Sequence, residues 1–473
     1  MALTSVLVSL AVCCRSDGAA LQPPASGVEG TWQGSISVSG FELRIVVQFT
    51  KKGPGAYSGT FLSVDQGAQV MPMDVVTYRA GVLHFELNAA HGSWDGKLND
   101  AGAELNGKWL QGGKEVALNF KRGGKIPVVN RPQEPHRPYP YQDVEVLYDN
   151  KSAGTKIGGT LTLPRTKPPF AAVLLITGSG QQNRDEEVFG HKPFLIIADY
   201  LTKRGIAVLR VDDRGMGKST GDFAKATTAD FATDVEAGIA FLKARHDIRK
   251  DKIGLIGHSE GGVIAPMVAA RSKDVAFIVM LAGTGVDGGK ILVAQGEMIS
   301  KAQGASEETI KFTKDLQVHV FAALAALVSE KDPLKVRARV QTVIDGEVQK
   351  LPAEVRTVQG KEAAEAGRAY LSPWMRYFIT YDPAPALQKV KCPVLVMNGE
   401  KDMQVPPKLN LPAIETALRE GGNKDYSIKL MPGMNHLFQI CQTGSPVEYS
   451  KIEETMSPLA LKTMGDWIVA RTK

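Results

Sequence analysis

A serine flanked by glycines stands between a short apolar run and a segment that can form a helix. Residues Gly257-His258-Ser259-Glu260-Gly261 form a G-x-S-x-G pattern, which presents a nucleophilic serine at a sharp turn from strand to helix. Such a turn leaves little room for side chains, so glycines are expected on either side of it. The backbone N–H of Glu260 begins the following helix and points to where an oxyanion would form. The pattern predicts Ser259 as a nucleophile.

A serine hydroxyl reacts poorly until a base removes its proton, and the base needs a carboxylate to orient it. Both partners are expected in loops that follow predicted strands. Asp402 follows the apolar run at 392–399, and His436 follows the alternating residues 426–430. The chain order Ser259, Asp402, His436 is the order found in α/β-hydrolases. We therefore predict a Ser-His-Asp triad.

Other residues compete for the two partner roles. Glu400 and Asp425 are alternative acids, but Asp402 is favoured because it lies far enough into its loop to turn back toward His436. Among the histidines, His258 lies inside the serine turn and is expected to pack or cap locally. The remaining histidines precede the acid in the chain, and some lie on predicted helices; these are His84, His91, His136, His191, His246 and His319.

A second oxyanion donor is expected in the loop after an earlier strand. Residues 171–177 form such an apolar run, and the small residues after it let backbone amides approach a ligand closely. The N–H of Ser179 or of Gly180 is the expected donor. Gly178 and Gly180 also resemble half of a dinucleotide fingerprint, but Asn183 replaces the third glycine and no Walker lysine follows. Nucleotide binding is therefore disfavoured.

Two polar motifs have alternative readings. Arg184 and Asp185, in the same loop, either contact substrate or form an internal salt bridge. The run Asp213-Arg214-Gly215 after the next strand is interpreted as a loop-shaping motif rather than a catalytic one.

Composition and charge are those of an ordinary globular protein. The 473 residues are 43% hydrophobic and 22% charged, which allows two or three units with a substantial core. The net charge of +6 is spread along the chain, so no nucleic-acid partner is expected.

Three segments follow one another after the N-terminus. Residues 28–123 alternate apolar and polar side chains, and glycine-flanked aromatics such as Trp94 recur, which predicts an all-β domain that is closed or sandwiched. A proline-rich linker is expected at 124–142, extended and semi-rigid. Residues 143–473 are the predicted catalytic domain.

The catalytic domain alternates strands and helices. This pattern is typical of a mostly parallel sheet with helices on both faces, the α/β class. Strands are predicted near 143–149, 156–163, 171–177, 206–211, 253–257, 276–282, 393–398 and 426–431.

An insertion with helical patterning is expected at about 286–388. In many hydrolases such an insertion forms a cap that excludes water from the site. Trp374, Tyr377 and Phe378 are the candidates for lining a substrate pocket. Alternatively, they pack between the cap and the sheet.

The first 27 residues are expected to be a signal or disordered segment. The apolar run Val6–Val12 is too short to span a bilayer but long enough for a signal-peptide core. Export to the periplasm or medium is expected, with a cytoplasmic location if the signal is not functional, and no stable membrane span is predicted. Cys392 and Cys441 either pair in an oxidising compartment or remain free.

The region from about Tyr141 to the C-terminus resembles an α/β-hydrolase and, within that superfamily, the bacterial EstD-type carboxylesterases. Three stretches carry the likeness: residues 178–186, residues 257–262 and residues 374–383. In that family a β-rich N-terminal domain precedes the hydrolase, and the activity is on short-chain acyl esters.

The resemblance implies Ser259 as nucleophile, His436 as base and Asp402 as the orienting acid. The sequence departs from the family at Gln182-Asn183, where a Pro-Gln-Asp-like run is expected before the arginine. This departure affects the oxyanion loop.

The sequence thus predicts a serine carboxylesterase that hydrolyses short-chain esters of small molecules through an acyl-enzyme. No metal or organic cofactor is expected, because the protein itself would supply the base and the oxyanion donors. Amide or peptide hydrolysis and acyl transfer on the same triad remain alternatives. A non-catalytic ligand-binding protein is a third, disfavoured by the intact set of serine, aspartate and histidine.

Overall fold

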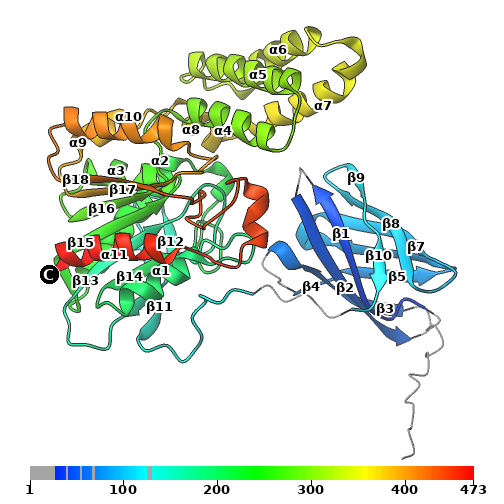
Figure 1. Ribbon diagram of the computed structural model, residues 1–473, viewed down its shortest axis with the longest axis horizontal. Helices are drawn as coiled ribbons and strands as arrows, with labels where there is room; N and C mark the ends of the chain where they lie inside the picture. Colours follow the sequence, from blue (N-terminus) through cyan, green and yellow to red (C-terminus); the bar gives the residue numbers. More distant parts are fainter. Residues whose placement is uncertain (1–26, 39–40, 54–55, 67–69, 125–129) are drawn as a thin grey trace, which may run out of the picture. The chain divides into compact units, whose positions relative to one another are not determined.

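The computed structural model describes residues 27–38, 41–53, 56–66, 70–124 and 130–473. The predicted signal segment lies outside these residues, apart from its last position. Within the described ranges, no helix combines the length and apolarity needed to cross a bilayer. The chain divides into two compact units, one holding most of the first 127 residues and the other holding most of the remainder (Figure 1).

The first unit is an antiparallel β barrel, which confirms the predicted all-β domain. Its sheet runs in the order β10-β1-β2-β3-β5-β6-β7-β8-β9, and a further pairing of β10 with β8 closes it. Of the two predicted forms, the closed one is therefore present. The strands are β1 (Gly30–Val38), β2 (Phe41–Gly53), β3 (Ala56–Ser63), β4 (Val70–Pro72), β5 (Val75–Arg79), β6 (Val82–Leu87), β7 (Gly92–Leu98), β8 (Glu104–Gln111), β9 (Lys114–Ala117) and β10 (Phe120–Arg122).

Aromatic side chains fill the barrel and explain the glycines beside them. The ring of Trp94 stacks on Phe85 with centroids 5.5 Å apart, and its indole N–H donates to the carbonyl of Leu118 at 2.8 Å. A Cβ at Gly96 or Gly107 would lie 2.3 or 2.4 Å from that indole ring. Glycine is required there because the ring lies directly over the neighbouring backbone.

The second unit contains a mixed eight-stranded sheet in the order β11-β12-β14-β13-β15-β16-β17-β18. The first three strands pair antiparallel, and all pairings from β14 onward are parallel. The predicted α/β class is confirmed. The strands are β11 (Gln142–Asn150), β12 (Thr155–Leu163), β13 (Phe170–Ile176), β14 (Ala207–Val211), β15 (Ile248–His258), β16 (Phe277–Leu281), β17 (Val394–Gly399) and β18 (Tyr426–Met431).

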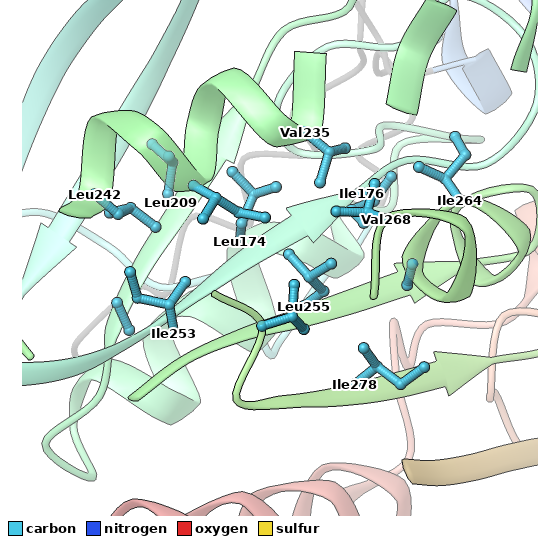
Figure 2. Close-up of a cluster of buried hydrophobic side chains, with 14 of the residues drawn as sticks. Leu174, Ile176, Leu209, Val235, Leu242, Ile253, Leu255, Ile264, Val268 and Ile278 are labelled. Carbon is cyan, nitrogen blue, oxygen red and sulfur yellow. The ribbon is translucent and has the colours of Figure 1, made fainter. Parts of the chain in front are cut away.

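Helices cover both faces of this sheet, and each face has its own apolar core. Leu174 and Leu255 belong to one cluster, shown in Figure 2, while Val173 and Ile256 belong to the other. This alternation follows from the opposite directions of successive side chains on a strand. The flanking helices are α1 (Pro193–Thr202), α2 (Thr228–Ala244), α3 (Gly261–Ala269), α10 (Pro407–Glu420) and α11 (Pro458–Thr472).

Six helices lie between β16 and β17, in the region where a helical cap is predicted. They have a separate apolar cluster that includes Phe321, Val340 and Ile344, and Figure 1 shows α4 to α8 grouped at one side of the sheet. The helices are α4 (Gly288–Ala302), α5 (Glu307–Ala326), α6 (Pro333–Gln349), α7 (Ala353–Ala369), α8 (Pro373–Thr380) and α9 (Ala384–Lys389).

The described part of the proline-rich segment is attached to the second unit. Arg131 donates to the carbonyl of Phe189 at 2.8 Å. Gln133 donates to the carbonyl of Met456 at 2.7 Å and accepts the N–H of Thr455 at 2.6 Å. Arg131 and Gln133 are therefore anchored to the second unit by hydrogen bonds.

Candidate active site

The serine turn has the geometry that its glycines predict. Ser259 connects β15 to α3 with a left-handed φ of 53°, a region that non-glycine residues rarely adopt. A Cβ at Gly257 would lie 1.9 Å from the carbonyl oxygen of Gly261, and one at Gly261 would lie 2.1 Å from that of Ile176. The N–H of Ser259 donates to the carbonyl of Leu281 at 2.8 Å. The half-buried Ser259 side chain is thus held on a rigid, strained turn.

His436 and Asp402 form a buried pair. Nδ1 of His436 lies 2.8 Å from Oδ2 of Asp402, and the two side chains are 5% and 0% exposed. Asp402 also accepts the N–H groups of Gln404 and Val405, each at 2.8 Å, and the amide of Asn398 at 3.0 Å. Because the carboxylate only accepts, Nδ1 of the neutral histidine carries the proton and Nε2 is left without one.

The two alternative acids lie elsewhere. Glu400 accepts the backbone N–H of Gly433 at 2.8 Å, and Asp425 pairs with Arg471 at 2.7 Å. Neither contact involves His436.

The histidine loop lies against the serine turn. The rings of His258 and His436 have centroids 4.8 Å apart, and Nε2 of His258 lies 3.1 Å from the carbonyl oxygen of His436. Within the described ranges, no hydrogen bond joins the Ser259 hydroxyl to His436. Catalytic hydrogen bonds are often long before substrate binds, so this arrangement is compatible with the predicted triad.

The predicted oxyanion loop borders Ser259. A Cβ at Gly178 would lie 3.2 Å from the Cβ of Ser259. The Gly178 N–H donates to Oε1 of Glu186 at 2.7 Å and is therefore engaged. The exposed Ser179 and Gly180 follow; in the part of the chain that the structure describes, neither their N–H groups nor that of Glu260 has a hydrogen-bond acceptor. These three N–H groups are therefore available to a ligand.

Salt bridges and hydrogen bonds hold the rest of this loop. Arg184 pairs with Asp212 at 2.6 Å, and Asp185 pairs with Arg210. Asp213 accepts the Gln182 N–H at 2.7 Å. Of the two readings of Arg184 and Asp185, the internal salt bridge is the one present.

The side chain of Glu260 connects the serine turn to the cap. Its Oε1 accepts the hydroxyl of Thr228 at 2.6 Å and the indole N–H of Trp374 at 2.7 Å. Burial raises the pKa of Glu260 to about 7, although these two hydrogen bonds lower it. Burial likewise raises the pKa of Asp213 to about 7. Both carboxyl groups border a small cavity of about 40 Å³ beneath the oxyanion loop.

The three candidate pocket aromatics lie on α8 and are half-buried. Trp374 stacks on Phe378 with centroids 5.1 Å apart, and Tyr377 stacks on Tyr381 at 5.5 Å. Trp374 therefore packs between cap and serine turn, with its polar edge on Glu260, while a role in lining a pocket stays a prediction for all three.

Sequence reasoning expected His258 to pack or cap locally but missed its partner, Glu186. Nδ1 of His258 lies 3.0 Å from Oε1 of Glu186, so His258 pairs with a carboxylate from a distant loop instead of capping locally. The available signal was an acidic residue inside the glycine-rich loop. Cys392 and Cys441 are free thiols.

Sheet order, serine turn and histidine loop together define an α/β-hydrolase. Residues 192–440 match the family described as "Serine aminopeptidase, S33", and because this match covers more than half of the 473 residues, the chain belongs to that family of hydrolases.

Named relatives include an esterase. The chain is 25% identical over 316 residues to Esterase EstD of Thermotoga maritima; the alignment covers 66% of this chain and 65% of the esterase, slightly less than two thirds of that protein's length. It is 23% identical over 215 residues to an uncharacterized 31.7 kDa protein of the traX-finO intergenic region of Escherichia coli. This alignment covers 45% of this chain and 68% of that protein.

Solved structures with similar folds have low sequence identity. Est1E from Butyrivibrio proteoclasticus, with ferulic acid bound, is 17% identical with a TM-score of 0.41, covering 69% of this chain and 98% of that one. The α/β hydrolase GrgF from Penicillium sp. sh18 is 16% identical with a TM-score of 0.42, and the match covers 70% of this chain and 99% of that one.

Proposed function

We propose that this protein is a serine carboxylesterase that cleaves short-chain carboxylic esters through an acyl-enzyme. The observation that carries the proposal is the buried Asp402–His436 pair, 2.8 Å apart, in a loop packed against the strained serine turn. The esterase relative supports the ester as substrate.

In the first half-reaction, Nε2 of His436 removes the hydroxyl proton of Ser259 while Oγ attacks the ester carbonyl. Asp402 keeps the proton on Nδ1 and stabilises the imidazolium that forms. The N–H groups of Glu260 and of Ser179 or Gly180 donate to the developing oxyanion. The alcohol then leaves with the proton from His436.

In the second half-reaction, water replaces the alcohol. His436 removes a proton from the water, the resulting hydroxide attacks the acyl carbonyl, and Ser259 leaves with the proton returned by His436. The products are a carboxylic acid and the regenerated enzyme, so atoms and charge balance.

Amide hydrolysis is a second candidate, because the matched family is described as a serine aminopeptidase. The same residues would serve it, with His436 protonating an amine instead of an alcohol. Substrate preference separates the two activities.

The test is turnover of p-nitrophenyl esters from acetate to palmitate, in parallel with aminoacyl p-nitroanilides. Ser259→Ala is the inactive variant, and Ser272→Ala, just beyond the other end of α3, is the control. The proposal expects Ser259-dependent cleavage that peaks at short acyl chains, and labelling by a fluorophosphonate in wild type and control only. Turnover of anilides alone would favour the aminopeptidase, and ester turnover that survives in Ser259→Ala would contradict the mechanism.

A further inference from the structure

A second histidine–carboxylate pair is buried beside the site, and the proposed mechanism does not use it. His258 and Glu186 lie 3.0 Å apart with side chains 8% and 3% exposed. The pair comes from two different loops, the serine turn and the oxyanion loop. A buried charged pair in this position requires an explanation, because an uncompensated charge there would be costly.

Both ring nitrogens of His258 face oxygen atoms. Nδ1 faces the Glu186 carboxylate, and Nε2 faces the carbonyl oxygen of His436 at 3.1 Å. A neutral imidazole has a single N–H, whereas an imidazolium donates from both nitrogens. The two acceptors therefore fit the charged form.

The surroundings of the ring favour the same form. Burial is the largest influence and opposes the charge, but Glu186, the His436 carbonyl and Asp402 together outweigh it, so the pKa of His258 is raised. The other titratable group facing the ring is the His436 imidazole, with centroids 4.8 Å apart.

The pair connects three loops that must keep their relative positions. Oε1 of Glu186 also accepts the N–H of Gly178, the first residue of the oxyanion loop. His258 holds the backbone of His436 and directly precedes Ser259 in the chain. Glu186 itself has a left-handed φ of 51°, a conformation maintained only where the surroundings enforce it.

We propose that His258 is an imidazolium permanently paired with Glu186, and that this pair positions the oxyanion loop and the His436 loop around Ser259. Neither residue touches the reacting atoms, so both are positioning residues. The effect on rate rests on the proposed function, whereas the charge state of His258 does not.

The charge state is tested by nitrogen NMR of the full chain labelled with ¹⁵N in its histidine rings. At pH 8 we expect a histidine with both ring nitrogens protonated whose signals are absent in His258→Asn and retained in His84→Gln. His84 is the matched control because it also pairs with a carboxylate, that of Asp95 at 2.8 Å, on the barrel. A His258 with one protonated nitrogen at pH 8 would overturn the proposal, and the signals lost in His258→Asn identify this residue in the wild-type spectrum.

The positioning role is tested by kinetics. Glu186→Gln keeps an acceptor for Gly178 but removes the charge, and we expect kcat for p-nitrophenyl acetate to fall about 10- to 100-fold, the size of a misplacement near 1 Å. KM should change less than about threefold, because binding contacts are untouched. The double variant Glu186→Gln/His258→Asn should lose no more than the worse single variant, since the two residues act as one unit.

The outcomes separate this proposal from the proposed function. If Ser259→Ala retains full turnover, the proposed function fails while the NMR result still decides the charge of His258. If turnover requires Ser259 but Glu186→Gln keeps the wild-type kcat, the positioning role alone is wrong. A loss of kcat of the same size in His84→Gln would also contradict the positioning role.

Discussion

The two buried histidine–carboxylate pairs at the site resemble each other in length and burial but differ in their surroundings. Asp402 and His436 lie 2.8 Å apart, and Glu186 and His258 lie 3.0 Å apart. Asp402 receives three further hydrogen bonds, two from its own loop and one from Asn398 in β17. Glu186 receives one, and in the described part of the chain its Oε2 has no hydrogen-bond partner.

The difference lies mainly in the second ring nitrogen of each histidine. Nε2 of His258 is occupied by a backbone carbonyl, whereas Nε2 of His436 has no acceptor among the described residues. A base needs a nitrogen that can take up a proton. The comparison therefore supports our two proposals, proton transfer by His436 and a fixed charge on His258.

The largest effect should come from removing the nucleophile or the base. Ser259→Ala and His436→Ala should each lower kcat by about 10⁴- to 10⁶-fold, and the double variant should lose little more, because the two residues work in one step. Steady-state hydrolysis of p-nitrophenyl acetate measures this. Additive losses would contradict the triad.

The two carboxylates should differ in the size of their effects. Asp402→Asn should lower kcat by about 10⁴-fold, because an amide neither fixes the tautomer of His436 nor stabilises its imidazolium. The loss expected for Glu186→Gln is at least about a hundredfold smaller than this, because that residue acts through position only. Equal losses measured in parallel would mean that the two pairs are not distinct in role.

A third buried carboxylate, that of Glu260, has no histidine partner among the described residues, and we expect its contribution to stability to depend on pH. The pKa of Glu260 is raised by burial from its usual 4.5 to about 7, so between these values the folded state binds more protons than the unfolded state. Its contribution to stability is then lost as pH rises through about 7. We expect the Tm of Glu260→Gln, relative to wild type, to increase from pH 5 to pH 8. A difference independent of pH would show that Glu260 is not protonated when folded.

The smallest effect is expected at the contact between cap and serine turn. Trp374→Phe removes the indole donor to Glu260, 2.7 Å long, while Thr228 still donates. A hydrogen bond of this kind contributes about 1 kcal/mol net, so kcat/KM should fall by about 2- to 10-fold. The control is Trp467→Phe, because the indole N–H of Trp467 has no partner in the described residues. An equal loss in both variants would point to general packing.

The α/β sheet could be predicted because its central strands, such as β13 and β16, are continuous apolar runs, while β11 and β18 alternate. All eight predicted strands are present. β15 begins before its predicted start, because its first part, Arg249 to Lys252, is charged and does not show the apolar pattern on which the prediction relied. The serine turn was also predictable from local sequence, because a side chain at Gly257 or Gly261 would clash with the backbone and glycine is therefore required there.

Contacts between distant loops could not be predicted. The pairing of Glu186 with His258 spans 72 positions and leaves no periodic pattern. Closure of the barrel likewise depends on β10 meeting both β1 and β8, which alternation of side chains does not specify. The sequence also left open whether Trp374 lines a pocket or packs between the cap and the sheet. The sequence does not show that the acceptor of its indole N–H is Glu260, which lies far away in the chain.

Three loops of the site each contain a non-glycine residue in the left-handed region: Glu186 at 51°, Ser259 at 53° and Phe438 at 60°. Glycine at position 186 or 438 would relieve the local backbone cost. That relief would be outweighed, because Glu186→Gly leaves the buried His258 without its carboxylate and Phe438→Gly removes a fully buried side chain from the core. The same torsions set the direction of the side chains around Ser259, so we expect these substitutions to lower turnover as well. Thermostabilising substitutions are better sought on the barrel and the outer helices, leaving these three loops unchanged.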